Sequence, residues 1–375
     1  MAVNKVEING EVKLDLTADT VTAAKLAQGE TAHDASGKRI TGTMTTLQLQ
    51  LIVTVSAGAT VTATNGSKTI TGTSDSTGVC MLAVPEIGTW SVSATLGGQT
   101  SDTKTVSITD SYAVTLSFVS STLDNNEWSV IKSVSDAGQG ANYWSIGDRK
   151  EVTLNGTVGN LMLSNVTTYV FIIGFNHNSS VEGTNRIHFQ LGKTELSGGK
   201  DVALCDIHYG NTGGGFRMNT NASNSGGWAS SNMRKNICGT SLTSYSGTIL
   251  AVIPAALRAV LKSVTKYTNN TGRSGDARAV TATTDYFFLL SEYEVFGSID
   301  YANINEADKQ AQYSYYSAGN SRVKYHHNAT NRVVDWWLRS PYIGNTKAFV
   351  LVYTNGLVSG SDATSSRGFA PGFCV

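Results

Sequence analysis

Short alternations of apolar and polar residues, broken at intervals by turn residues, constrain this chain more than any other feature. Between residues 47 and 119 apolar side chains fall at every second position, as in Leu49, Leu51 and Val53, and Gly, Asn, Ser or Asp interrupts them about every ten residues. Such alternation is typical of strands that bury one face. The chain also holds 38 Gly but only 4 Pro. We therefore predict a mostly β, turn-rich fold.

The pattern changes twice along the 375 residues, which divides the chain into three predicted parts. Residues 1–46 are too few to fold alone, and they hold a predicted tight turn at 34–38. Residues 47–119 are expected to form a small β-sandwich. Residues 120–375 are expected to form one α+β unit that contains the convincing helices. The length agrees with two or three domains.

Four segments carry helix signals in the form of a capping residue, a first-turn proline or a glycine that follows the last turn. They run from Asp19 or Thr20 to Ala27, from Trp228 to Gly239, from Pro254 to Val264, and onward from Ser291. After Pro254, the apolar residues Leu257, Val260, Leu261 and Val264 have the spacing of one helical stripe. Ser291 and Glu294 have the spacing of a capping box.

The charge balance excludes electrostatic capture of a polyanion as the main activity. Lys and Arg total 28, Asp and Glu total 28, and the formal net charge is zero, so no basic surface for nucleic acid or anionic membrane is expected. The start of the sequence lacks the apolar core of a secretory signal, and no apolar run approaches the length of a membrane span. The cysteines are expected to be reduced, mostly buried thiols, with a disulfide such as Cys205–Cys238 as the alternative: Cys80, Cys205, Cys238 and Cys374.

No residue pattern in the sequence supports catalysis. It contains neither a phosphate-binding glycine loop nor a Gly-x-Ser-x-Gly nucleophile turn, and we expect no enzyme, no cofactor and no metal. The His326–His327 pair is expected to lie exposed in a loop. Five acidic residues are expected to form a solvated surface, with calcium ligation as the alternative: Glu292, Glu294, Asp300, Glu306 and Asp308.

The stretch Asp335-Trp-Trp-Leu-Arg-Ser-Pro341 is the most informative part of the sequence. The adjacent Trp336 and Trp337 must face opposite sides of a strand, so each side chain needs packing or a ligand. We expect both to anchor the fold.

The residues after this stretch predict a hairpin. Phe349 to Tyr353 alternate, and Val350 and Val352 are expected to be on the core side of a strand. Asn355-Gly356 predicts the turn. Residues 359–367 are small and polar, and they are expected to form a surface loop.

Two resemblances concern the first 119 residues. Residues 29–44, Gly-Glu-Thr-Ala-His-Asp-Ala-Ser-Gly-Lys-Arg-Ile-Thr-Gly-Thr-Met, resemble a short element of bacteriophage tail and baseplate proteins, which implies that residues 1–46 are a phage tail attachment segment. The alternative is an ordinary hairpin. Residues 47–119 resemble immunoglobulin-like (Ig-like) or carboxypeptidase-regulatory-like modules, which implies an Ig-like β-sandwich spacer.

Several motifs are distributed over residues 120–375: Trp128-Ser-Val-Ile, Gly147-Asp, Gly227-Trp, Met233-Arg, Phe288-Leu-Leu-Ser-Glu-Tyr-Glu-Val, Trp336-Trp-Leu-Arg-Ser-Pro and Gly356. Together they resemble a formylglycine-generating-enzyme-type domain with a C-type lectin fold, frequent in phage and gut-bacterial proteins. The sequence departs at Ala370-Pro371, where relatives often have Arg-Pro. The fold class expected for the whole chain is therefore mostly β, with an α+β C-terminal domain of C-type lectin fold.

Within that family, residues 335–375 resemble the variable region of diversity-generating retroelement proteins, which is rewritten by reverse transcription that mutates adenines. Adenine changes in an Asn codon do not give Glu, Gln, Trp, Met or Lys, and residues 342–369 contain none of the first four, although Lys347 departs from this rule. The resemblance implies that Trp336, Trp337 and Arg339 are framework residues, which support the fold and do not contact the ligand. It implies these variable, ligand-binding positions: Tyr342, Ile343, Gly344, Asn345, Ala348, Leu351, Tyr353, Leu357, Ser359, Gly360, Ser361, Asp362, Ser365 and Arg367. An exposed hairpin without programmed diversity is the alternative.

The resemblances imply a phage tail-associated receptor-binding protein, located in the virion and made in the bacterial cytoplasm. Its expected partners are a bacterial surface protein or glycan, other phage tail proteins, and further copies of the same chain in a homo-oligomer, expected to be a trimer. Neither nucleic-acid binding nor membrane insertion is expected. A non-diversified bacterial surface adhesin or carbohydrate-binding protein is the alternative, and an enzyme of the formylglycine-generating type is a more distant one.

Overall fold

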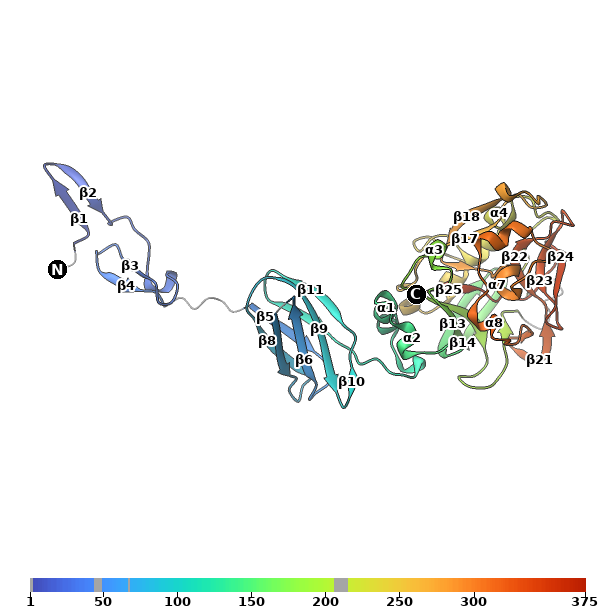
Figure 1. Cartoon of the computed structure of the whole chain (residues 1–375), viewed down its shortest axis with the longest axis horizontal. Coiled ribbons are helices and arrows are strands. Elements are labelled where there is room, and N and C mark those ends of the chain that lie inside the picture. The colour runs from blue at the N-terminus through green and yellow to red at the C-terminus, as the bar shows by residue number, and fades with distance from the viewer. Residues whose placement is uncertain (1–2, 44–48, 67, 206–214) are drawn as a thin grey trace. The chain divides into compact units, whose positions relative to one another are not determined.

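A computed structural model describes residues 3–43, 49–66, 68–205 and 215–375. The chain divides into two compact units, Met1–Phe118 and Val119–Val375 (Figure 1). The described residues are mostly β, arranged in several small sheets with short helices between them. Among the helices of these residues, none has the length and apolar character needed to cross a membrane.

Residues 3–43 form two hairpins. Strand β1 (Lys5–Ile8) pairs with β2 (Glu11–Asp15), and β3 (Thr31–His33) pairs with β4 (Arg39–Thr41). The tight turn predicted at 34–38 is confirmed, since the Asp34 N–H donates to the Lys38 carbonyl at 3.0 Å. The helix predicted up to Ala27 is wrong. Its place is taken by a single 3-10 turn, Ala23–Lys25, because the preceding Thr22 is extended and caps nothing with its side chain.

Residues 49–118 form two sheets around one core. One sheet contains β6 (Thr60–Asn65), β7 (Lys68–Thr73), β9 (Gly88–Leu96), β10 (Gln99–Thr100) and β11 (Lys104–Ile108), and the other contains β5 (Leu49–Thr54), β8 (Val79–Val84) and β12 (Tyr112–Thr115). The alternating residues Leu51, Val53, Val61 and Val92 are buried around Trp90. The alternating pattern therefore predicted strands such as β5, β6 and β9, in which every second residue is buried.

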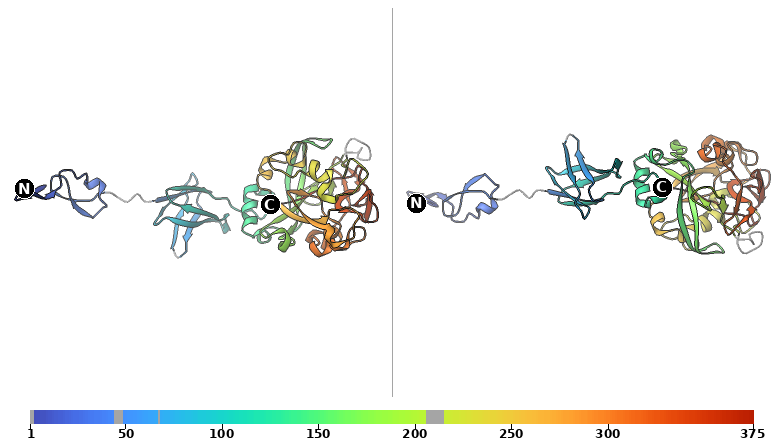
Figure 2. Two further views of the ribbon diagram at one scale, coloured as in Figure 1. Left: turned by 90° about the horizontal axis from the view of Figure 1, so that it is seen from above. Right: turned by 90° about the horizontal axis from the view of Figure 1, so that it is seen from below.

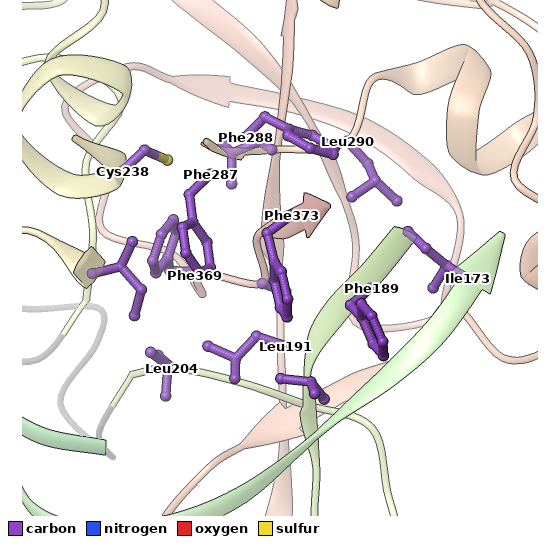
Figure 3. Packing of buried hydrophobic residues seen from close by; sticks show 14 of the residues in the cluster. Ile173, Phe189, Leu191, Leu204, Cys238, Phe287, Phe288, Leu290, Phe369 and Phe373 are labelled. Carbon is purple, nitrogen blue, oxygen red and sulfur yellow. The ribbon is translucent and has the colours of Figure 1, made fainter. Parts of the chain in front are cut away.

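The second unit has a five-stranded sheet at its centre. Its order is β13 (Arg149–Val158), β14 (Leu161–Phe175), β15 (Ile187–Lys193), β25 (Gly372–Cys374) and β19 (Phe287–Phe288). The last strand in sequence, β25, thus lies between two others. Figure 3 shows Phe373 of β25 between Phe189 and Phe287, with ring centroids 5.3 Å and 5.0 Å away. These aromatic contacts join the end of the chain to the core.

Short elements surround this sheet. The remaining strands are β16 (Val202–Ala203), β17 (Val264–Asn269), β18 (Val280–Asp285), β20 (Lys324–His326), β21 (Ala329–Val334), β22 (Trp336–Pro341), β23 (Ala348–Val352) and β24 (Val358–Asp362). The α-helices are α1 (Trp128–Asp136), α2 (Gly140–Tyr143), α3 (Ser179–Glu182), α4 (Gly227–Ser230), α5 (Ile249–Val252), α6 (Ala255–Arg258), α7 (Glu292–Phe296) and α8 (Ser314–Ser317). The 3-10 turns of this unit are Leu123–Asn125, Ala277–Ala279 and Ile304–Lys309.

The helix predictions in this unit have mixed outcomes. The capping box at Ser291 is confirmed, since its hydroxyl accepts from the Glu294 N–H and the Glu294 side chain accepts from the Ser291 N–H. The Trp228 segment splits into α4 and a π-helical turn, Met233–Cys238, which ends at Gly239 as predicted. The long helix predicted after Pro254 is wrong: α6 ends at Arg258, and Val264 already belongs to strand β17.

Candidate functional site

The informative C-terminal stretch forms an antiparallel sheet in the order β22-β23-β24, which we call the platform. The sheet gathers on one side of the second unit in each view, coloured red (Figures 1 and 2). The turn predicted at Asn355-Gly356 is confirmed, with Gly356 at a φ of +83° and the Tyr353 N–H donating to the Leu357 carbonyl at 2.8 Å. The loop predicted over 359–367 is partly wrong, because its first residues pair with β23 as strand β24.

Val350 and Val352 are buried as expected, but strand β23 is buried on its other face too. Phe349 and Leu351 are buried as well. Two of the candidate ligand-binding positions are therefore corrected: Ala348 and Leu351 are each only 2% exposed. The physical reason is that β23 is the middle strand and Leu351 is packed into the apolar core of the second unit.

The other candidate positions are accessible. Tyr353 and Leu357, at the β23–β24 turn, are 48% and 62% exposed. Gly344 and Asn345 are also exposed, and the following are half-buried: Tyr342, Ile343, Ser359, Gly360, Ser361, Asp362, Ser365 and Arg367. These positions thus lie along β24, in the two loops that flank β23, and in the segment that follows β24.

The two tryptophans of β22 hold the platform to the rest of the unit. Both side chains are fully buried. The indole N–H of Trp336 donates to the Arg322 carbonyl, and that of Trp337 to the Phe216 carbonyl, each at 2.9 Å. Both rings are therefore packed, and both polar atoms are satisfied by protein partners.

Arg339, which belongs to strand β22 of the platform, is buried in an ion network. Its guanidinium donates to both carboxylate oxygens of Glu294, and also to the hydroxyl of Thr268 at 2.8 Å. The ammonium of Lys266 lies 2.9 Å from Glu294. Burial on its own would raise the pKa of Glu294, but Arg339 and Lys266 outweigh it and hold this pKa well below its usual range. Removal of either cation would leave a buried charge without its partner.

The expectation of a solvated acidic surface is wrong for three of the five residues, while Asp300 and Asp308 are exposed as expected. Glu292, Glu294 and Glu306 are buried. Glu292 accepts hydrogen bonds from the N–H groups of residues 300, 301 and 302 at 2.6–3.0 Å, while burial raises the pKa of Glu306 to about 7. The carboxylate oxygens of these three residues accept hydrogen bonds from other groups of the protein, and these bonds account for their burial.

Asn224 supports the platform and carried no sequence signal. Its buried side-chain amide lies 2.9–3.1 Å from the carbonyl oxygens of Tyr342, Asn345 and Ala348. Its own N–H donates to the Thr346 carbonyl at 2.8 Å. An asparagine more than a hundred residues away in sequence thus holds the 342–348 loop in place.

The half-buried ring of Tyr342 connects several candidate positions. It packs against Tyr301 with 4.7 Å between ring centroids. A Cβ atom added at Gly344 would lie 2.6 Å from this ring, and one at Gly360 would lie 2.9 Å from it. Replacement of either glycine therefore requires the tyrosine to move.

A second buried cluster contains His177, Glu182 and His188, whose potential ligand atoms all lie within 4.8 Å of one another. Lys266 binds Glu182 at 2.9 Å as well as Glu294. A metal ion at this place would face that ammonium, and the carboxylate charge is already neutralised. The residues therefore fit a buried ion network better than a metal centre.

Cys374 lies beside this cluster, with its Sγ 3.2 Å from Nδ1 of His188. Burial raises the pKa of Cys374 to about 12, and burial lowers the pKa of His188 well below its usual value. Both groups are therefore neutral near pH 7, whereas a reactive cysteine needs a lowered pKa. All four cysteines are buried, as predicted.

The prediction that both histidines of the His326–His327 pair are exposed is wrong. His326 is 1% exposed and His327 is half-buried. The reason is that β20, which contains His326, lies between β16 and β21 in its sheet. His326 Nδ1 is 3.5 Å from Sγ of Cys205.

The C-terminal part of the chain is similar to a known domain family. Residues 211–375 match a family described as "Domain of unknown function (DUF6273)". The match includes Asn224, the platform and strand β25. No curated protein matches the chain.

Proposed function

We propose that this protein is a bacteriophage tail-associated receptor-binding protein whose platform binds a bacterial surface ligand without catalysis. The observation that carries the proposal is the contrast across the platform: Tyr353 and Leu357 are exposed, while Trp336, which pairs with Val352, is fully buried. Side chains on such a surface can change without loss of the fold. Tyrosine is a residue that contributes strongly to binding at interfaces.

The proposal includes the finer fold classes. We infer an Ig-like spacer in residues 49–118, supported by two sheets around Trp90. For residues 119–375 we infer a C-type lectin-type domain, supported by the burial of the Trp336–Pro341 motif that carries the family resemblance. Residues 1–46 would attach the protein to the tail of the virion, which is assembled in the bacterial cytoplasm.

Diversification by a retroelement is the second part of the proposal. It is supported by the accessibility of all candidate positions other than Ala348 and Leu351. The test is the DNA that flanks the gene. We expect a near-copy of the region for residues 335–375 that differs at adenines, beside a reverse-transcriptase gene. A neighbourhood that contains neither would remove diversification and leave the binding proposal intact.

Binding is tested with the purified, fluorescently labelled chain on a panel of bacterial strains. We expect it to bind a subset of the strains, and the double variant Tyr353→Ala, Leu357→Ala to lose that binding. The matched control is Met162→Ala, because Met162 is 78% exposed but lies outside the platform. Equal binding by the double variant and the control would contradict the proposal, and so would a lack of binding to every strain.

A further inference from the structure

A hollow of about 430 Å³ in the second unit, which we call the side pocket, borders the C-terminal segment that follows β24. Its volume is within the range of about 300–1,000 Å³ that is usual for small-molecule sites. Among the described residues that line it, none is a candidate ligand-binding position, but Ser366 lies between two of them in sequence, Ser365 and Arg367. The lining includes Asn160, Phe216, Arg217, Thr220, Asn236, Ile237 and Ser366.

Hydrogen bonds fix the walls of the side pocket to the C-terminal segment. The Phe216 N–H donates to the Arg367 carbonyl at 2.9 Å, and the Arg367 N–H donates to the Phe216 carbonyl at 2.8 Å. The indole N–H of Trp337 donates to the same Phe216 carbonyl. In another part of the lining, the side-chain oxygen of Asn219 accepts from the Asn232 N–H at 2.9 Å. The pocket is therefore held in shape before a ligand arrives, which lowers the cost of binding.

The side pocket combines buried apolar side chains with accessible neutral polar ones. Phe216 and Ile237 are only 2% and 6% exposed. Asn160, Thr220 and Asn236 are exposed, and their amides and hydroxyl can both donate and accept hydrogen bonds. This combination suits a compact ligand that has apolar C–H groups and several hydroxyls, which is the chemistry of a sugar ring.

Arg217 adds one positive charge to the side pocket. Its side chain is exposed, and within the part of the chain that the structure describes it forms no ion pair. None of the described lining residues is acidic. A guanidinium binds a carboxylate through two parallel hydrogen bonds. We propose that the side pocket binds a sugar that carries a carboxylate, as part of a glycan on the bacterial surface, with Arg217 bound to that carboxylate.

The distribution of charge around the side pocket favours an anionic ligand. Arg234 and Lys266 are neutralised by acidic residues that come later in the sequence, Asp285 and Glu294, whereas Arg217 is left for a ligand. One cation in a pocket recognises a single carboxylate, which differs from the capture of a polyanion by a basic surface. Residues 207–275 contain no Asp or Glu but seven Lys or Arg: Arg217, Arg234, Lys235, Arg258, Lys262, Lys266 and Arg273.

The inference rests on the proposed function only for the source of the sugar, and its test uses no cells. Calorimetric titration of the full chain compares glucuronate with glucose, which lacks the carboxylate. We expect glucuronate to bind roughly 10-fold more tightly or better, and Arg217→Gln to remove this preference by weakening glucuronate alone. The control is Arg273→Gln, because Arg273 is exposed but does not line the side pocket. This control should bind both sugars as the wild type does.

A second variant tests the sugar and not its charge. Asn236→Ala should weaken glucuronate and glucose by the same factor, because the amide would bind ring hydroxyls that both sugars have. Acetate and inorganic phosphate should bind much more weakly than glucuronate. Binding of either anion as tightly as glucuronate would show a site for an anion alone and would overturn the inference.

Two other results would also overturn it. One is a lack of glucuronate binding at millimolar concentrations, and the other is an Arg217→Gln chain that binds glucuronate as tightly as the wild type. Either result could occur while the wild-type chain still binds bacterial strains through the platform. Failure of this inference is therefore distinguishable from failure of the proposed function, which the variants at Tyr353 and Leu357 test.

Discussion

Leu351 and Tyr353 provide a matched pair for testing which positions on the platform can be exchanged. The resemblance to variable proteins places both among the diversified positions, and they are two residues apart in sequence. In the structure Leu351 is 2% exposed, whereas Tyr353 is 48% exposed. We predict that Leu351→Asn strongly destabilises the second unit and that Tyr353→Asn leaves its stability nearly unchanged.

The magnitude follows from the two environments. Loss of a fully buried leucine side chain costs about 2–3 kcal/mol in transfer free energy, and a buried amide without partners adds about 1–3 kcal/mol. Leu351→Asn should therefore lower the free energy of unfolding by about 3–6 kcal/mol, a large part of the total for a typical domain. Tyr353→Asn should change it by less than about 1 kcal/mol, as most surface substitutions do.

Guanidinium-induced unfolding, followed by tryptophan fluorescence, measures both variants. Of the six tryptophans only Trp90 belongs to the first unit, so the signal reports mainly on the second. We expect the midpoint for Leu351→Asn to fall by about 1 M, given a denaturant slope of several kcal/mol per M. Equal midpoints for Leu351→Asn and the wild type would refute the reasoning that burial decides which positions can vary.

Three further predictions concern residues around the platform. Gly360→Ala should destabilise the second unit by about 1–2 kcal/mol, because the added Cβ atom would lie 2.9 Å from the Tyr342 ring. In thermal unfolding, the same substitution should cost much less in a chain that also contains Tyr342→Ala. Asn224→Ala should lower the free energy of unfolding by about 1–3 kcal/mol, since the Asn224 side-chain amide contacts three carbonyl oxygens of residues 342–348. It should also speed amide hydrogen exchange in these residues, and unchanged exchange would contradict the role of Asn224. Burial lowers the pKa of Lys324 from 10.5 to about 8 beside Asp201 and the competing Lys193. The unfolded chain therefore holds more protons at Lys324 between pH 8 and 10.5, so the contribution of this residue to the free energy of unfolding should rise with pH in that window. The raised pKa of Cys374 acts in the opposite direction, so the measurement is the difference in pH dependence between the wild type and Lys324→Met, which should show this rise.

Local signals in the sequence predicted local structure well. The Ser291 capping box and the Asn355-Gly356 turn are each defined by residues within a few positions of one another, so neighbouring chemistry was sufficient. The apolar residues after Pro254 predicted a helix that reaches Val264, and this prediction was wrong. Val264 pairs with Asp285 of β18, and this distant partner overrides the helical spacing. The spacing of apolar residues in 254–264 is helical, and it could not reveal that the last of them belongs to a strand.

The candidate site was predictable only in outline. The two tryptophans of β22 were correctly expected to be packed, because adjacent large aromatic residues on a strand need cover on both sides. Alternation could not show that both faces of β23 are covered, since the second layer comes from elsewhere in the chain. The burial of Glu306 and the role of Asn224 likewise depend on partners far away in sequence.

The central claim is that the accessible side chains of the platform can be exchanged while its interior is kept. The most direct measurement is a displayed library in which Tyr353, Leu357, Ser359, Ser361 and Asp362 are randomised together, selected for protease resistance and then for binding to bacterial strains. We predict that most members remain as protease-resistant as the wild type and that the strains they bind differ. Survival of only wild-type-like residues at these positions in the protease selection would contradict the claim.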